Sequence, residues 1–594
     1  MSDTAVSLRS QTAILADLFR RRVASLRNRV DYLEPLKLLD SKAAVRMAVE
    51  LFGEGTHQAA GIDGSMDFDE VLELLLFYVC ASGYSTTFNV ESGEVNFDLA
   101  GATRIPGLSM SAAVPLWEED LANVLEATGT GESDPDLRRS RERIPFALMT
   151  MAELSLAFDI VRSEKYRLLF LDRPLSGTFP GLSRDAASLL VRGSSSLTGI
   201  NTSAGQLRFA DIFLAVGLGS GQVWVPPRGG NLAYAAIRVL LERSRVTGED
   251  LRKTLHLSNS ELQQLIRLLT KLNNHLDNGL LEITECDLKI KEELAGYWTR
   301  TVQACMQVIS KIFKDSKHSL LSEDGKWLSV LDLNTVNLIL VYALAQEASD
   351  RRVLVVGVAK DTSATEYSRA VLPYLLSRKA PKPKPPEISS DKAFLTVLSA
   401  VNPGSLPPPW RTPAYDACFT TLYWDRDCKN PLKAARKVVS RERMFTRAYF
   451  QLRSFTGDPA LRSPVFLYDR LFMPETDREI PVLEVTERGR LTTLRPFIES
   501  YQFSEIDNLV LYLLSRTDSS EVMEAYGHNQ LLYLADKYVK EEIEQMKGLL
   551  RGVVELELTP LARREKVFTI ARRFRDLRAA SERARKNRTR RVEA

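Results

Sequence analysis

Residues 57–65, which read HQAAGIDGS, constrain the fold more than any other stretch of this chain. A short apolar run ends there in Asp63, and a glycine and a serine follow at once. Such a run predicts a buried strand with a sharp turn at the glycine, which would leave the Asp63 carboxylate at the sheet edge where α/β proteins gather ligands. Residues 166–174 (YRLLFLDRP) have the same form and place Asp172 at the end of a second strand. The pair predicts an α/β protein with one metal site shared by two strand ends.

Length and composition narrow the class of protein. A chain of 594 residues indicates two to four domains, or one large domain with insertions. Its 44% hydrophobic and 26% charged residues are typical of globular proteins, and no apolar run approaches the roughly 18 residues that span a bilayer. The first residues lack the layout of a secretion signal, and the five cysteines contain no CxxC pair. We therefore expect a cytoplasmic protein without a zinc ribbon, a disulfide framework or a membrane contact.

The amino-terminal 50 residues predict amphipathic helices. An apolar stripe between arginines consists of Leu15, Phe19, Val23, Leu26 and Val30. Two interpretations are open: an arm that packs on a partner subunit, or a helix that covers the chain's own sheet. The second is the more common arrangement and is the one we expect.

Residues 232–283 predict a small unit inside a longer helical insertion at 205–345. A helix is followed by a helix start at Thr247, a turn at 257–260, a further helix at 260–272 and a strand-like segment at 280–283. This order fits a winged helix, whose third helix can enter a DNA groove. The alternative is a helical insertion that only packs.

The carboxyl-terminal tail is the most basic part of the chain. From residue 561 onward it holds thirteen Lys and Arg residues against four Asp and Glu residues. Its apolar residues recur at helical spacing at Val567, Ile570, Phe574 and Leu577. The tail is either a solvated basic helix or a contact to phosphates, and the second interpretation predicts salt-sensitive binding to nucleic acid.

Glu153 adds a third carboxylate to the two strand-end aspartates. It lies in a predicted helix at 145–163, among apolar residues, where a charge is costly unless it is paired or bound to a cation. Three hard oxygen ligands suit Mg²⁺ or Mn²⁺ and suit zinc poorly. Such a metal activates a water and stabilises charge on a phosphodiester during in-line attack.

These motifs resemble those of the NurA nuclease family. The resemblance begins with the DGS at Asp63, Glu153 and the LD that contains Asp172, and continues with residues 358–361 (VAKD), 448–452 (AYFQL) and 525–528 (AYGH). All six occur in the family's order and extend over residues 57–540. NurA proteins have an RNase H-like core, cut DNA with Mn²⁺ and work with the hexameric translocase HerA.

The resemblance implies a role for six residues. Asp63, Glu153 and Asp172 would bind the metal, Lys360 and Tyr449 would lie at the reaction centre, and His528 would complete the site as a further ligand. A lysine can neutralise developing charge on phosphate, a tyrosine can orient the substrate or stack on a base, and a histidine can bind metal or move a proton. Each of the last three also has an ordinary explanation: a solvated lysine, a core tyrosine and a histidine that caps or packs.

The chain departs from the family in three places. Arg173 replaces the small residue that usually follows the second aspartate, and it would either contact phosphate or alter substrate choice. The insertion at 205–345 and the Pro-rich segment near 378–410 make the chain longer than a compact NurA. No GxxxxGK[ST] motif is present, so any motor must be a partner.

We therefore predict an α/β protein with an RNase H-like core, a mixed central sheet flanked by helices, and helical termini. We expect a Mn²⁺- or Mg²⁺-dependent DNA nuclease for single and double strands, forming a homodimer and docking on a HerA-type ATPase, in DNA end processing or anti-phage defence. The alternatives are a non-catalytic DNA-binding adaptor that uses the insertion and the tail, and an enzyme for RNA or branched DNA. The predicted segments are a helical arm at 1–50, core at 51–204, insertion at 205–345, core at 346–377, Pro-rich insertion at 378–435, core at 436–550 and basic tail at 551–594.

Overall fold

The computed structural model describes residues 2–27, 29–71, 74–125, 141–221, 231–284, 287–315, 318–322, 325–376, 388, 390–417, 422–423, 433–434, 444–455, 458–473, 476–477, 485–486, 493–494, 497–499, 504–518 and 526–564. Much of the Pro-rich insertion and the tail beyond Arg564 lie outside these residues. The four apolar tail residues that we expected on one helix face, from Val567 to Leu577, therefore lie outside them as well.

The described residues form an eleven-stranded mixed sheet, which confirms the predicted α/β class. One half contains three long antiparallel strands with a short one at the edge: β2 (Gly55–Val71), β3 (Leu74–Val90), β5 (Thr103–Trp117) and β4 (Val95–Phe97). Two short strands run parallel to β2: β6 (Tyr166–Leu171) and β12 (Leu354–Ala359). The other half continues antiparallel through β20 (Phe466–Leu471), β17 (Phe445–Gln451), β13 (Trp410–Arg411), β14 (Tyr415–Asp416) and β1 (Lys37–Leu38).

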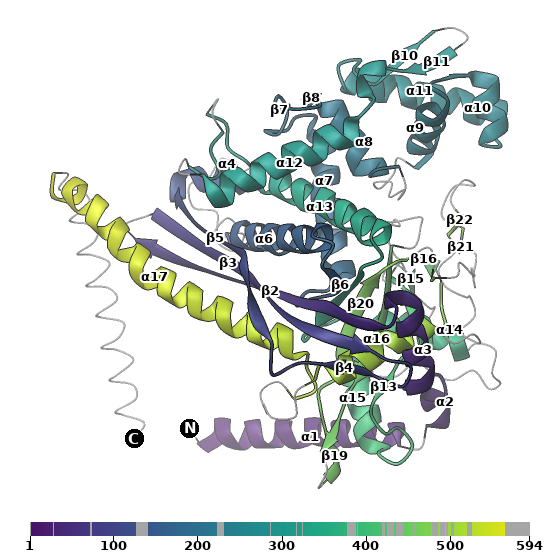
Figure 1. Ribbon diagram of the computed structural model, residues 1–594, viewed down its shortest axis with the longest axis vertical. Helices are drawn as coiled ribbons and strands as arrows, with labels where there is room; N and C mark the ends of the chain where they lie inside the picture. The colour runs from purple at the N-terminus through teal and green to yellow at the C-terminus, as the bar shows by residue number, and fades with distance from the viewer. Residues whose placement is uncertain are drawn as a thin grey trace.

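Helices cover both faces of this sheet (Figure 1). One face packs against α6 (Arg143–Arg162), α7 (Leu175–Arg192) and α13 (Val330–Asp350). The other packs against α3 (Ser41–Phe52), α16 (Glu505–Arg516) and the long α17 (Gln530–Arg564). Side chains alternate along β6 accordingly, because successive strand residues point to opposite faces: Leu169 and Leu171 lie in the α6 layer, and Leu168 and Phe170 in the α17 layer.

Helix α6 is apolar along most of its length. Within the described residues it alone is long and apolar enough to cross a membrane by composition, and 83% of its most apolar window is buried inside the protein. Its burial between the sheet and α13 is that of a core helix.

The predicted strand end at Asp63 is wrong. Strand β2 continues to Val71 and pairs with β3 residue for residue throughout. What ends beside Asp63 is the parallel pairing with β6, which stops at Ile62. The apolar run of β3, residues 74–81, offers the rest of β2 a full partner, so the ladder continues past the glycine.

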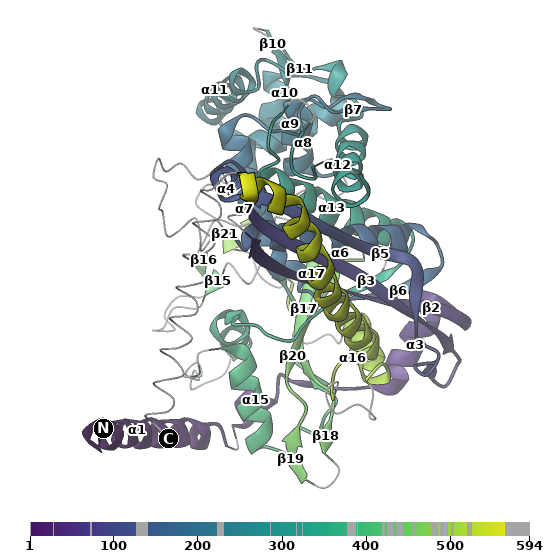
Figure 2. The ribbon, with the colours of Figure 1, turned by 90° about the vertical axis from the view of Figure 1, so that its left-hand side faces the viewer.

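The amino-terminal helix α1 (Ser2–Leu26) does not cover the sheet, contrary to the expected arrangement. Leu15 is 65% exposed and Phe19 56% exposed, while Leu26 at its end is buried. Helix α1 extends away from the body beside α15 (Asp391–Val401), as Figure 2 shows. It is α3, farther along the chain, that packs its apolar face on the sheet.

The insertion forms a distinct group of elements at one end of the molecule, opposite α1 (Figures 1 and 2). Its elements are α9 (Asn231–Arg243), β9 (Arg245–Thr247), α10 (Gly248–Thr254), α11 (Asn259–His275), β10 (Leu281–Ile283) and β11 (Asp287–Ile290). The three strands form an antiparallel sheet in the order β10-β11-β9. Thr247 and Ser258 cap the two inner helices, as their position before acidic residues predicts. The helices and the strand expected over 232–283 are therefore present.

The remaining elements are short or lie between these layers. They are α2 (Val30–Leu33), α4 (Leu121–Leu125), α8 (Phe209–Leu218), α12 (Tyr297–Lys314), α14 (Leu372–Leu376), three single turns at Glu118–Asp120, Glu292–Leu294 and Tyr367–Val371, and the strand pairs β7 (Asn201–Thr202) with β8 (Gly205–Gln206), β15 (Leu422–Tyr423) with β16 (Lys433–Ala434), β18 (Ser454–Phe455) with β19 (Asp458–Arg462), and β21 (Val485–Thr486) with β22 (Thr493–Leu494).

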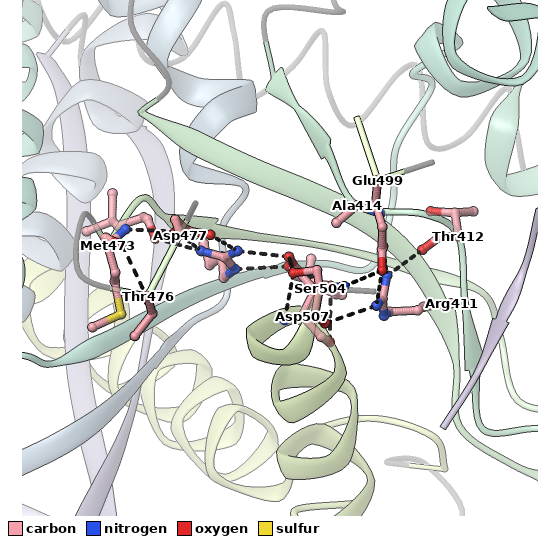
Figure 3. A network of polar contacts seen from close by, with 12 residues as sticks. Arg411, Thr412, Ala414, Met473, Thr476, Asp477, Glu499, Ser504 and Asp507 are labelled. Atoms are coloured by element: carbon pink, nitrogen blue, oxygen red, sulfur yellow. Dashed lines mark hydrogen bonds and ion pairs between the residues drawn. The ribbon is translucent and has the colours of Figure 1, made fainter. Parts of the chain in front are cut away.

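A buried network of charges ties the antiparallel half of the sheet to α16 (Figure 3). Arg470 of β20 donates to Asp477 (Nη1 to Oδ2, 2.6 Å) and to Asp507 at the start of α16 (Nη2 to Oδ2, 2.8 Å). Arg411 of β13 binds Glu499 through both terminal nitrogens. Burial alone would raise the pKa of Asp507, but the neighbouring arginines hold it well below its usual value. We call these five residues the arginine network.

Candidate functional site

Three of the predicted site residues meet where the parallel strands end. The amide of Asp172 donates to the carbonyl of Ile62 at 3.0 Å, so Asp172 lies beside Asp63 on the neighbouring strand. Lys360 follows β12, and its Nζ lies 2.6 Å from Oδ2 of Asp172. Strand alternation directs all three side chains to the sheet face that α17 covers. A close approach at Gly61 supports this, because an added Cβ there would lie 2.7 Å from Cβ of Leu531 in α17.

The charges at this position are unbalanced. Burial, and then the proximity of Asp172 and Glu153, raise the pKa of Asp63 well above its usual value, which Lys360 opposes only in part. Burial also raises the pKa of Asp172, against the opposing effect of Lys360. Burial lowers the pKa of Lys360, but the two aspartates outweigh it and the net shift is upward. The site therefore holds more carboxylates than its one lysine neutralises.

Glu153 reaches the same place from the opposite face of the sheet. It lies on α6, it is buried, and its Oε2 accepts from Nε of Arg173. Its carboxylate lies against Gly64, where an added Cβ would come within 2.9 Å of Cγ and 3.0 Å of Cδ of Glu153. The glycine after Asp63 thus serves a different purpose from the one we predicted: β2 does not turn there, but leaves room for a carboxylate.

Arg173 faces the protein interior. It is 5% exposed, and besides Glu153 its guanidinium donates to Oγ1 of Thr150 at 2.8 Å. Of the two interpretations of this residue, a direct phosphate contact disagrees with the structure, because the donors are directed at α6. Arg173 instead compensates the buried charge of Glu153, whose pKa burial nevertheless raises.

His528 lies immediately before α17, on the same face as Asp63. Its ring packs against Phe466 at 5.5 Å between centroids, and neither ring nitrogen has a hydrogen-bond partner among the described residues. Burial, followed by the positive charge of Lys360, lowers the pKa of His528 to about 3, so the imidazole is neutral near pH 7. A buried neutral imidazole with two free nitrogens can take a ligand or a water.

Asp536 of α17 is the site residue that the sequence analysis missed. Its charge acts on Asp63, Asp172, Lys360 and His528. The side chain is 22% exposed and pairs with Lys540 at 2.8 Å. A signal was present, because Asp536 follows the buried Leu532 by four residues and so shares its helix face.

Tyr449 does not join this group, which corrects its predicted place at the reaction centre. In β17 its neighbours Ala448 and Phe450 face α16, so Tyr449 faces the other side of the sheet. It is fully buried there, and its hydroxyl donates to Oδ2 of Asp391 at 3.3 Å. Burial and the nearby Glu366 raise the pKa of Asp391 to about 7.

The donor set suits a hard cation but is not a closed metal cage. Among the described residues, no three His, Cys, Asp or Glu side chains lie close enough together to hold a metal ion on their own. Asp63 and Asp172 nevertheless offer adjacent carboxylates where the parallel pairing of β2 with β6 ends, with excess negative charge. Mg²⁺ is commonly held by only one or two carboxylates, with waters and substrate phosphates filling the remaining positions. The residues present fit an ion bound in that way.

Comparison with known proteins adds a weak structural likeness. No protein-family model matches this chain, and no curated protein matches it. It is similar to a crystal structure of NurA with manganese (12% identity, TM-score 0.35, covering 92% of this chain and 98% of that chain). It is also similar to the NurA nuclease from Sulfolobus solfataricus (12%, 0.34, 92% and 95%) and to a further NurA structure (13%, 0.36, 93% and 96%). A likeness at this level establishes neither a family nor an activity.

Proposed function

We propose that this chain is a Mn²⁺- or Mg²⁺-dependent deoxyribonuclease acting on single- and double-stranded DNA. The observation that carries the proposal is the meeting of Asp63 and Asp172 beside Lys360, with more negative charge than the lysine balances. A divalent cation would remove that imbalance, and DNA phosphate would complete its coordination. Neutral substrates would have no comparable use for this arrangement.

The order of elements supports an RNase H-like core. Apart from the short β1 and β4, three antiparallel strands, β2, β3 and β5, come first in the sheet. Helix α6 follows, and then β6 and β12 run parallel to β2. The proposed ligands come from the first strand, the first covering helix and the fourth strand of that series. Similarly, the order of α9, β9, α10, α11 and the β10–β11 hairpin supports a winged helix.

Each residue has a role that matches its surroundings. Asp63 and Asp172 would hold the metal, which supplies an activated water and stabilises the charge of the phosphate. Glu153 would join through Oε1, the oxygen that lies against Gly64, since Oε2 is engaged by Arg173. Lys360 would remain charged, because its pKa is raised. Its ammonium group would stabilise the negative charge that develops on a phosphate oxygen in the transition state. His528, neutral and unpartnered among the described residues, binds the water or the ion.

A partner protein would have to supply any ATP-driven movement of the DNA. The chain contains no nucleotide-binding P-loop, so we propose that a HerA-type hexameric ATPase feeds DNA to it and that the nuclease is a homodimer. We propose DNA end processing or anti-phage defence as the biological task of this pair. Co-purification with a HerA-type ATPase from the same cell tests the first point, and light scattering of the purified chain tests the second.

The activity itself is tested with labelled single-stranded DNA, duplex DNA and RNA, each with Mn²⁺, Mg²⁺ or chelator. We expect metal-dependent cutting of both DNA substrates, lost in Asp63→Asn. The matched control is Asp69→Asn, six residues along the same strand, whose carboxylate pairs with Arg551 at 3.3 Å and lies outside the site. Cutting that survives Asp63→Asn would refute the assignment of the active site to Asp63. Cutting of RNA alone would show that the substrate is RNA and not DNA. DNA binding without cutting would favour the adaptor.

A further inference from the structure

Helix α11 has one buried face and one polar face. Leu265 and Leu269 are fully buried against the rest of the insertion. The opposite side exposes Gln263, Gln264, Arg267, Thr270, Lys271 and Asn274. Side chains three and four residues apart lie together on a helix, so these six form one continuous surface. We call it the α11 face.

The charge of the α11 face is positive and uncompensated. Arg267 and Lys271 lie one helical turn apart, and neither forms an ion pair or a hydrogen bond with any of the described residues. Residues 262–276 contain no acidic residue. Several other cations of the insertion are paired, such as Arg245 with Asp287, Arg252 with Glu249 (2.6 Å) and Lys289 with Glu292 (2.9 Å). On the α11 face, two cations without such a partner lie beside exposed amide side chains.

The helix is held firmly in this position. Oδ1 of Asn273 accepts from the amides of Leu280 (3.1 Å) and Leu281 (2.8 Å), which fixes the end of α11 to β10. Nε2 of His275 lies 2.8 Å from the carbonyl oxygen of Leu190, which ties α11 to α7 of the core. Because α11 is anchored to both β10 and α7, its backbone is already ordered, and binding through this face costs little conformational entropy.

The dimensions and side chains of this face suit duplex DNA. Seventeen residues give a helix of about 25 Å, and the major groove of B-DNA, about 12 Å wide, admits one helix. Glutamine and asparagine can bond adenine, arginine can bond guanine, and lysine can bond phosphates. Helix α11 is also the third helix of its unit, after the short α10, which is the place of the recognition helix in helix-turn-helix proteins.

We propose that the α11 face binds the major groove of duplex DNA, as an arm separate from the catalytic site. This inference extends the proposed function by giving the nuclease a duplex-binding surface on its insertion. It depends on the proposed function only in taking DNA as the partner, because binding can be measured without cleavage. Arg267 and Lys271 supply the phosphate contacts, and the amide side chains that flank them on the helix meet base edges.

The test measures binding of the full chain to a labelled 20-base-pair duplex by fluorescence anisotropy, in chelator and at several salt concentrations. In Arg267→Gln with Lys271→Gln we expect affinity to fall about tenfold or more at low salt, and the slope of log K against log salt to decrease by about 1.8, or 0.9 per lost phosphate contact. Cutting of a short single strand with Mn²⁺ is expected to stay within twofold of wild type.

The matched control is Lys42→Gln with Arg46→Gln. These two residues are also exposed and one helical turn apart, but they lie on α3, outside the insertion. The proposal is refuted if the α11 variant keeps wild-type affinity and salt slope, if the control loses as much, or if the α11 variant loses only binding to a partner protein. A wild-type chain that binds duplex through the α11 face but never cuts DNA would refute the nuclease and leave this inference standing.

Discussion

Two buried clusters of charge in this protein differ in how their charges are balanced. In the arginine network, Arg470 and Arg411 face Asp477, Asp507 and Glu499, and each carboxylate accepts from a guanidinium. In the site around Asp63, the charges of Asp172 and Glu153 both act on Asp63. Arg173 pairs with Glu153, and Lys360 pairs with Asp172. The pKa of Asp507 is lowered, whereas the pKa of Asp63 is raised.

The difference distinguishes a structural cluster from a functional one. A buried carboxylate with its own arginine holds two elements together, here β20 and α16. A buried carboxylate beside others, without enough cations, costs stability, and it persists where binding of a cation is useful. The arginine network is therefore balanced by its own residues, whereas the Asp63 site has an excess of negative charge that the proposed metal would offset.

Loss of a carboxylate from the balanced cluster should have the largest effect on stability. Asp507→Ala leaves Arg470 buried with one partner fewer, and we expect the free energy of unfolding to fall by about 3–5 kcal/mol. Urea unfolding measures it. The control is Asp17→Ala, which removes an exposed pair with Arg21 on α1 and should cost less than about 1 kcal/mol. Equal effects of the two substitutions would contradict the stabilising role of the arginine network.

A methyl group at Gly64 should disturb the site through Glu153. Gly64→Ala places a Cβ against that carboxylate, so we expect a loss of about 1–3 kcal/mol in stability and a marked loss of cutting. Gly181→Ala on α7 is the control, because an added Cβ there meets nothing within 4 Å. Full activity in Gly64→Ala would show that Glu153 need not approach β2.

Replacing the charged Asp63 by a neutral residue should stabilise the protein and should abolish the rise in melting temperature that Mn²⁺ causes. The raised pKa of Asp63 means that its ionised form opposes folding, so Asp63→Asn should raise the melting temperature by about 1–3 °C at pH 7 without metal. The gain should shrink as the pH falls through the raised pKa toward about 4, since the folded wild type then takes up the proton itself.

Thermal melts with and without Mn²⁺, from pH 4 to pH 8, test this. Wild type should melt higher with Mn²⁺, and Asp63→Asn should lose that shift. Asp507→Asn provides the opposite sign: its lowered pKa contributes stability above pH 4 that is lost as the pH falls, so the substitution should destabilise at pH 7. A lower melting temperature in Asp63→Asn at pH 7 would contradict the described imbalance.

The smallest effect is expected at Tyr449. Tyr449→Phe removes a hydroxyl bonded to Asp391 on the far face of the sheet, and should cost about 1 kcal/mol in stability. Cutting of single-stranded DNA should remain within twofold of wild type. A large loss of cutting with an unchanged melting temperature would indicate that Tyr449 acts at the reaction centre. It would contradict the conclusion that Tyr449 and Asp63 act on opposite faces of the sheet.

Much of the site was predictable from local pattern, and the errors have a common origin. Asp172 and Lys360 follow short apolar runs, and both lie at strand ends as expected. Asp63 follows the same pattern but lies in mid-strand, because its partner strand β3 is long. The direction of Tyr449 depends on the register of β17 against β20, which no short motif encodes. Asp536 escaped notice because its neighbours in the site come from other segments.

The sequence by itself determined the α/β class, the three carboxylates, the lysine and the element order of the insertion, since these depend on residue type and local periodicity. Tertiary structure alone decided which charges meet. It paired Arg173 with Glu153, brought Asp536 to the site, and turned Tyr449 away from it. The physical reason is that strand register and helix packing set distances between segments hundreds of residues apart, and electrostatic interactions depend on those distances.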